Sequence, residues 1–127
     1  MPARIFLGLS ALLWLPYGIY CFLSPGALAG MAGVASNTTT GSIELRAMYG
    51  GLQAAIGALA VAGLLRDSMR RPALLALVFL CGGLALARIS GAALESELSA
   101  YTAMGLFFEL VSVGCAAGLL GREPAPA

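Results

Sequence analysis

Four long apolar runs dominate this sequence and leave little chain for anything else. They cover about residues 5–23, 43–65, 73–94 and 99–120, and each is close to the roughly 20 residues that an α-helix needs to cross a bilayer. Hydrophobic residues make up 60% of the 127 residues and charged residues only 10%, whereas soluble domains carry about 25% charged residues. A short soluble domain could not bury so much apolar surface. The sequence predicts an all-α integral membrane four-helix bundle, a single transmembrane domain over residues 1–127.

Turn-forming and charged residues separate the four runs. The expected breaks are a Ser-Pro-Gly turn at 24–26, a basic loop at 66–72 that places Pro72 in the first turn of the next helix, an acidic turn at 95–97, and Gly121 followed by Pro124 and Pro126. The first connection, residues 27–42, is long, uncharged and rich in Gly, Ser and Thr.

Arginines predict the orientation of the bundle. With four spans, the arginines outside the spans all fall on one side, at Arg4, Arg66, Arg70, Arg71 and Arg122. The positive-inside rule then places both termini in the cytoplasm. We expect a multi-pass protein of the bacterial inner (cytoplasmic) membrane, with its lipid bilayer as the first partner.

The N-terminal run also has features of a signal peptide, with Arg4 before it and a small-residue site at 27–29. However, the apolar run 5–23 is longer than the about 7–15 residues of a signal core. We therefore expect it to be retained as the first span.

Several function classes lack support in the composition. Histidine is absent, and Cys21, Cys81 and Cys115 form no CxxC pair, so we expect no metal site, no disulfide and no cofactor, and treat the cysteines as small buried apolar residues. A net charge of +1 without a basic run gives no reason to expect a nucleic-acid partner. We find no catalytic motif, which favours a role other than an enzyme.

Small residues recur at helical spacing in three of the spans. The stripes are Gly50, Ala54, Ala58 and Ala62 in the second, Gly83, Ala87 and Gly91 in the third, and Gly114 and Gly118 in the fourth. Such residues allow membrane helices to pack closely. They predict either tight packing within the bundle or a seam for a homodimer or another membrane protein.

Ionisable residues at membrane depth are the most informative candidates for a site, because they are costly there and commonly face the interior or mark a functional path. They are Glu44 and Arg46 in the second span, Arg88 in the third and Glu109 in the fourth.

Helical spacing places Tyr49 and Gln53 on the face of Arg46, and span one offers Trp14 and Tyr17 as a wall. From the depth of each residue we expect an Arg88–Glu109 pair with Tyr49 and Gln53 as hydrogen-bonding neighbours. Arg46 would instead reach Glu95 or Glu97.

Three interpretations of this polar cluster remain open. It is a buried ion pair that fixes helix register, a pocket for an anionic head group, quinone or other amphiphile, or a proton path that uses Glu109. A carboxylate far from water needs either a partner or a proton.

The segment 44–51, Glu-Leu-Arg-Ala-Met-Tyr-Gly-Gly, followed by Gly57, resembles the signature of small four-span bacterial membrane proteins known only as a domain of unknown function. That group resembles a branch of the DoxX-like assemblage, and Arg88 and Glu109 fit its pattern. The resemblance covers about residues 4–120 and implies a four-span fold without an established activity. Some DoxX-like relatives are linked to quinone-coupled sulfur oxidation or redox homeostasis, but this chain has neither paired thiols nor histidine.

The sequence favours a non-catalytic module that binds a small amphiphile or a membrane partner through the polar cluster in the outer half of the bundle. One alternative is an accessory subunit of a membrane redox or transport complex. The other is an enzyme or proton-coupled carrier that uses Glu109.

Overall fold

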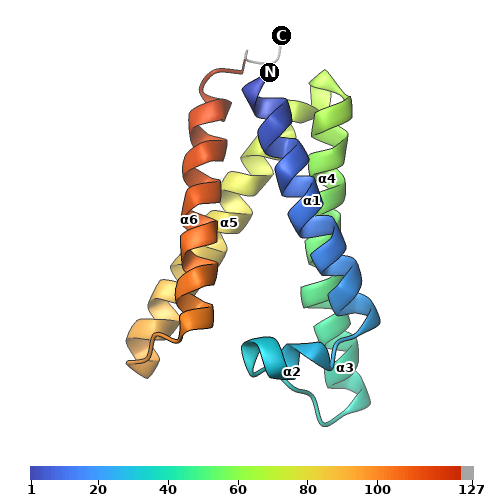
Figure 1. Ribbon diagram of the computed structural model, residues 1–127, viewed down its shortest axis with the longest axis vertical. Coiled ribbons are helices and arrows are strands. Elements are labelled where there is room, and N and C mark those ends of the chain that lie inside the picture. Colours follow the sequence, from blue (N-terminus) through green and yellow to red (C-terminus); the bar gives the residue numbers. More distant parts are fainter. Residues whose placement is uncertain (124–127) are drawn as a thin grey trace.

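The computed structural model describes residues 1–123, and within them it is built of helices (Figure 1). The elements in chain order are α1 Pro2–Leu23, α2 Ala27–Ala32, α3 Thr39–Leu45, the π-helix η1 Arg46–Gly51, α4 Leu52–Leu65, α5 Asp67–Glu95 and α6 Ala100–Leu120. Four helical stretches are long and apolar enough to cross a membrane: Pro2–Leu23, Thr39–Leu65, Asp67–Glu95 and Ala100–Leu120. The prediction of an all-α, four-span chain is confirmed.

The basic segment 66–72 differs from its prediction, because most of it is helical. Only Arg66 departs from helical geometry, with φ −124° and ψ 121°, and α5 begins at the next residue. Pro72 therefore lies inside α5, beyond its first turn. The predicted end of span four agrees with a helix that stops at Leu120, while Pro124 and Pro126 lie outside the described residues.

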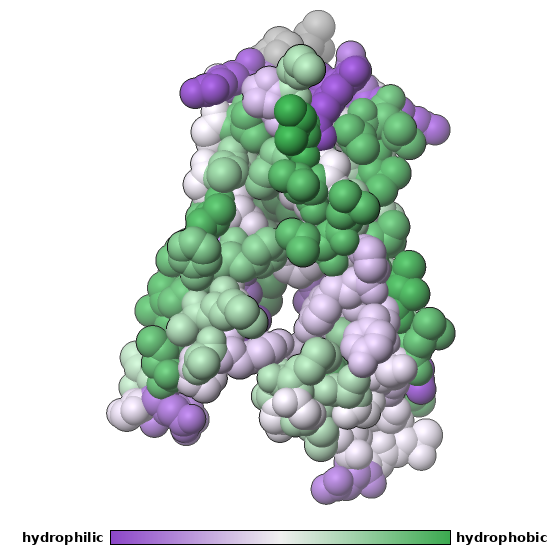
Figure 2. All heavy atoms as spheres, in the orientation of Figure 1, coloured by the Kyte–Doolittle hydropathy of each residue, from purple (hydrophilic) through white to green (hydrophobic). Residues whose placement is uncertain are grey.

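The helices form two pairs that meet at one end and separate at the other (Figure 1). Helix α1 packs along η1 and α4, and α5 packs along α6, whereas α1 meets α5 and α6 at few positions. We call the end that carries Met1 and Leu120 the terminus end, and the end that carries α2, α3 and the 95–99 turn the open end. Figure 2 shows an opening between the two pairs towards the open end.

The apolar core closes the terminus end. Leu7 of α1 and Leu74 and Leu77 of α5 are at most 2% exposed, and Ala3 and Ala73 are also buried there. Many large apolar side chains elsewhere point outward, as lipid-facing side chains do in a membrane bundle. The interior is thus filled at one end and hollow at the other.

Glycines bring α1 and α4 into close contact. A Cβ added to Gly57 would lie 2.7 Å from the Cα of Leu15, one on Gly50 would lie 2.7 Å from the Cβ of Phe22, and one on Gly18 would overlap the backbone of Ala54. Close backbone approach of this kind replaces the hydrophobic effect as the source of helix association in lipid. Gly50 and Ala54 therefore pack closely against α1, as the small-residue stripe of the second span predicts.

Among residues 1–123, most of the other predicted small-residue contacts are not made. Ala58 and Ala87 are exposed, and a Cβ on Gly83, Gly114 or Gly118 would meet nothing within 4 Å. Intramolecular packing through these residues is a wrong expectation, because the α5–α6 contact uses other faces of both helices.

Charged side chains tie the terminus end together. Arg4 lies 2.8 Å from Asp67, Arg70 also pairs with Asp67, and Arg70 lies 3.6 Å from Glu123. Arg71 donates hydrogen bonds to the carbonyl oxygens of Leu120 and Glu123, each at 3.2 Å. These contacts join the first, third and fourth helices at this end.

Two of the three cysteines are buried, as expected. Cys21 and Cys81 are inaccessible, whereas Cys115 is exposed on α6. The expectation that all three are buried is wrong for Cys115, because its face of α6 has no neighbouring helix.

Candidate functional site

The predicted pair between Arg88 and Glu109 forms in the interior. The Nε of Arg88 on α5 donates to Oε1 of Glu109 on α6 at 2.7 Å. Glu109 is only 2% exposed, while the Arg88 side chain retains 29% of its exposure. One end of the ion pair is therefore locked in the helix interface, and the other end reaches the space between the helix pairs.

Gly105 makes room for this arrangement. It lies one turn before Glu109 on α6, and a Cβ at this position would stand 3.1 Å from the Cζ of Arg88. The guanidinium also lies over the ring of Tyr101, 5.9 Å from its centroid, within the range of a cation–π contact. Helix α6 thus positions Arg88 in three ways. Glu109 pairs with it, Gly105 leaves room for its guanidinium, and the ring of Tyr101 lies against it.

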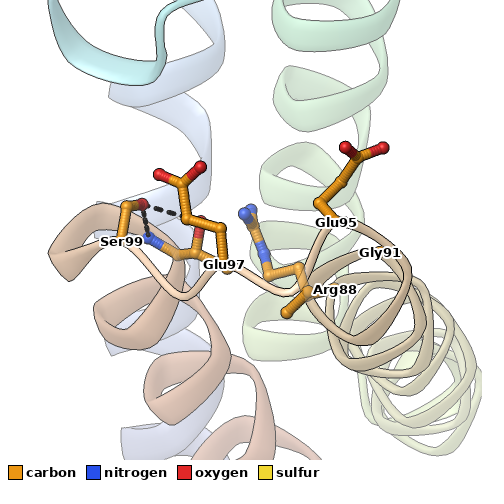
Figure 3. A pocket seen from close by; sticks show the side chains of 7 residues that line it. Arg88, Gly91, Glu95, Glu97 and Ser99 are labelled. Atoms are coloured by element: carbon orange, nitrogen blue, oxygen red, sulfur yellow. Dashed lines mark hydrogen bonds between the residues drawn. The ribbon is translucent and has the colours of Figure 1, made fainter.

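A cavity of about 330 Å³ opens beside Arg88 at the open end. Its lining residues come from the end of α5, the following turn and the start of α6, namely Arg88, Gly91, Ala92, Glu95, Glu97, Ser99 and Thr102. Figure 3 shows the guanidinium directed into this space, with Glu95 at the end of α5 and Glu97 on the following turn beside it. Within residues 1–123, Nη1 and Nη2 of Arg88 donate to no protein acceptor.

The start of α6 is fixed by a cap that belongs to the cavity wall. The Oγ of Ser99 accepts from the backbone N–H of Thr102 at 3.1 Å, and the two hydroxyls lie 2.9 Å apart. An N-cap of this kind satisfies a helix N–H that would otherwise lack a partner. It therefore also holds two hydroxyl groups at the mouth of the cavity.

Apart from the Nε of Arg70 at the terminus end, three buried side-chain polar atoms on three helices lack a hydrogen-bond partner in the described chain. They are Nε1 of Trp14, Oε1 of Gln53 and Oε2 of Glu109, on side chains that are 7%, 9% and 2% exposed. An unsatisfied buried polar atom costs about 1–3 kcal/mol and calls for an explanation such as a bound molecule. All three atoms belong to residues that the sequence singles out.

The aromatic wall predicted from span one faces α6. The rings of Trp14 and Phe108 are 5.7 Å apart and tilted by 55°, and Tyr17 lies beside Tyr101. Sequence reasoning missed Tyr101, although it stands eight residues before Glu109, a spacing that shares a helix face. Glu95, Glu97, Ser99 and Thr102 were also missed as cavity residues, since the acidic turn reads as an ordinary exposed loop.

Arg46 does not take the partner predicted for it. Its guanidinium donates to the carbonyl oxygen of Phe22 and lies 5.7 Å from the centroid of that ring. In residues 1–123 it forms no ion pair with Glu95 or Glu97, because it is directed at the C-terminal end of α1, where carbonyl groups lack helical partners. Arg46 therefore fastens α1 to η1.

Glu44, Tyr49 and Gln53 are also placed differently from their predictions. Glu44 is exposed on α3. No hydrogen bond joins Tyr49 or Gln53 to Arg88 or Glu109 within the described chain, and the Oε1 of Gln53 is unpaired. Tyr49 is half-buried in η1, the type of helix that occurs frequently at functional sites.

The arrangement is a blind cleft rather than a path through the bundle. The buried leucines of α1 and α5 close the terminus end, and the polar groups begin only beyond them. Among residues 1–123 no three His, Cys, Asp or Glu side chains gather in a way that could hold a metal ion. What the cleft offers is hydrogen-bond donors and acceptors at the edge of an apolar space.

Residues 2–120 match the model of a family described as a domain of unknown function, DUF4345, and the chain belongs to that family. No match was found among curated proteins or among solved structures.

Proposed function

We propose that this chain is a non-catalytic membrane module that binds the head group of a small amphiphile in the cleft beside Arg88. The observation that carries the proposal is that only one nitrogen of the Arg88 guanidinium is paired within the described chain. Its Nε is held by Glu109 at 2.7 Å, while its terminal nitrogens face a cavity of about 330 Å³.

The ion pair suits binding because it is pre-formed. Glu109 pairs with the Nε of Arg88 and fixes its side chain, so that a ligand does not have to order a free arginine on arrival. The helix pairs separate towards the open end, which leaves an apolar space beside the polar groups for the tail of an amphiphile.

We propose that both termini face the cytoplasm and that the chain lies in the bacterial inner membrane. The arginines at the terminus end, among them Arg4 and Arg66, lie together on one side of the bundle. The positive-inside rule places that side in the cytoplasm. A single cysteine at Leu98, in a variant whose native cysteines are replaced, should react with a membrane-impermeant maleimide in intact cells. A cysteine at Arg66 should react only after lysis, and the reverse result would contradict this orientation.

Two other functions have weaker support. The exposed Gly114 and Gly118 favour contact with a second copy or with the other subunits of a redox or transport complex. We also propose, with the same weaker support, that the chain is related to the DoxX-like proteins and that its ligand is a quinone. A proton-coupled carrier or enzyme that uses Glu109 is less favoured, since Arg88 already holds this carboxylate and apolar leucines close the cleft.

The test of the proposed function is whether the purified protein keeps an amphiphile bound. The full chain, purified in mild detergent, should retain such a molecule in native mass spectrometry. Arg88→Gln should abolish retention, whereas Arg66→Gln, which changes an exposed arginine at the other end, should not. Thermal melting of each variant reports whether it is folded. A folded Arg88→Gln variant that retains the molecule as the wild type does would refute the proposal.

A further inference from the structure

The charges around the cavity identify the class of head group more closely, and this step rests on the proposed function. We infer that the cleft takes a zwitterionic phospholipid head group with a primary ammonium, its phosphate on Arg88 and its ammonium at Glu95 and Glu97. Phosphatidylethanolamine is the lipid of this chemistry.

Both signs of charge line the same cavity. Arg88 contributes its unpaired terminal nitrogens, and Glu95 and Glu97 contribute two carboxylates that form no ion pair within residues 1–123. A purely anionic head group would be drawn to Arg88 but would meet the two carboxylates. A purely cationic one would meet Arg88. A head group that carries both charges complements the cavity, since complementary charge selects partners chiefly by penalising the wrong ones.

The order of the charges along the bundle matches the order within a phospholipid. Arg88 precedes Glu95 by seven residues on α5, which places its Cα about 10 Å deeper along the helix axis. The carboxylates lie at the end of the helix and on the turn that follows (Figure 3). A phosphate lies deeper in a leaflet than the amine attached to it, so the phosphate would meet the arginine and the amine would meet the turn.

The cavity wall favours a primary ammonium over a quaternary one. Its members include the hydroxyls of Ser99 and Thr102 beside the carboxylates, and no aromatic side chain. A primary ammonium has three N–H donors for such acceptors. A quaternary ammonium has none and is recognised mainly by aromatic cages. Ethanolamine is therefore a better match than choline.

The acyl chains of a bound lipid can extend from the site into the bilayer. Figure 2 shows the helix pairs parted towards the open end, with green apolar side chains on the outer sides of both. On α5 and α6, large apolar residues such as Leu86 and Met104 are 68% and 67% exposed, and in a bilayer such residues face lipid. A lipid can thus hold its head group in the cavity while its tails remain in the bilayer.

The experiment is a competition among lipids. The full chain in mild detergent is mixed with equal amounts of phosphatidylethanolamine, phosphatidylcholine and phosphatidylglycerol of the same acyl composition, and native mass spectrometry counts the adducts. We expect the ethanolamine lipid to bind about tenfold better than the glycerol lipid. The Glu95→Gln/Glu97→Gln variant should lose this preference and bind phosphatidylglycerol better than the wild type does. Arg66→Gln is the matched control, with a charge removed at the opposite end.

The outcomes separate this inference from the proposed function. Wild-type protein that binds the three lipids equally, or a double variant whose preference is unchanged, would overturn the zwitterion assignment even if Arg88→Gln releases every lipid. Equal binding by wild type and Arg88→Gln would instead overturn the proposed function. Soluble sn-glycero-3-phosphoethanolamine is a phosphodiester that carries the same two charges without tails, and its displacing the lipid at equal concentration would show that a free phosphoamine is the ligand.

Discussion

At the scale of single residues, the site depends on one position that has no side chain. Gly105 stands opposite the guanidinium of Arg88, and a methyl group there would lie 3.1–3.4 Å from Cζ, Nε and Nη1. At Gly114, nine residues later on the same helix, a methyl group would meet nothing within 4 Å. The two glycines thus allow a local steric effect to be separated from a general effect on the helix.

Gly105→Ala should displace the guanidinium and weaken lipid retention. Alanine itself favours a helix over glycine by about 1 kcal/mol, so Gly114→Ala should raise stability, while crowding at Arg88 should cancel that gain in Gly105→Ala. Thermal melting in detergent and native mass spectrometry measure the two effects. Equal melting and equal lipid retention in the two variants would show that Gly105 does not position Arg88.

The ion pair should behave as a coupled unit. Arg88→Gln or Glu109→Gln leaves a buried charge without its partner, a loss of about 3–5 kcal/mol for buried pairs. The double variant should be less destabilised than the sum of the two, because neither charge is then left alone. Unfolding free energies of the four proteins give the coupling, and strict additivity would mean that the 2.7 Å contact contributes nothing.

How far the sequence predicts the site also depends on single residues. Arg88 and Glu109 are predictable, because two opposite charges at membrane depth on neighbouring spans have few other partners. Arg46 is not, because its partner is the carbonyl oxygen of Phe22, and a backbone acceptor leaves no mark in the sequence. Tyr101 and Ser99 reach the site only through the angle at which α6 leaves the turn.

At the scale of elements, the contact between α1 and α4 depends on which small residues face each other. Span two contains small residues on several faces: Gly50 and Gly57 meet α1, and Gly63 also meets α5. The sequence predicts that helices can approach closely, but the face is decided by the pairing. The π-helix η1 also affects which residues face α1. Its wider turn rotates the residues before it about the helix axis, relative to those after it.

Gly57→Ala should therefore disrupt the α1–α4 pair. The new methyl group would overlap the backbone of Leu15, with 2.7 Å to its Cα, and backbone cannot move aside as a flexible side chain can. Overpacking of this kind costs about 1–3 kcal/mol. Gly83→Ala, on the open face of α5, is the control. Thermal melting should separate the two variants, and equal midpoints would argue against close packing at Gly57.

At the scale of the whole molecule, the number of spans follows from the sequence and the shape does not. Four apolar runs, each long enough to cross a bilayer, predict four spans, and the four helices have the length and composition for it. The separation of the two helix pairs depends instead on where contacts are missing, and the sequence does not show that α5 and α6 turn Gly83, Ala87 and Gly118 away from the other pair. The blind cleft is a property of this pairing.

Two helix pairs that are joined at one end and apart at the other should move as two arms. Spin labels at Leu23→Cys and Leu94→Cys, both exposed at the open end, report the separation of the arms. Labels at Leu9→Cys and Leu75→Cys, also exposed, report the terminus end. Both pairs are introduced after the native cysteines are replaced by alanine.

Adding phosphatidylethanolamine to the detergent-solubilised protein should shorten and narrow the distance distribution at the open end in pulsed electron paramagnetic resonance. The terminus end should not change, because buried leucines already hold the arms together there. Arg88→Gln should abolish the response, since the lipid stays between the arms only while the guanidinium holds its head group. A response of equal size at both ends, or one that persists in Arg88→Gln, would show that the lipid acts on the bundle in general and not through this site.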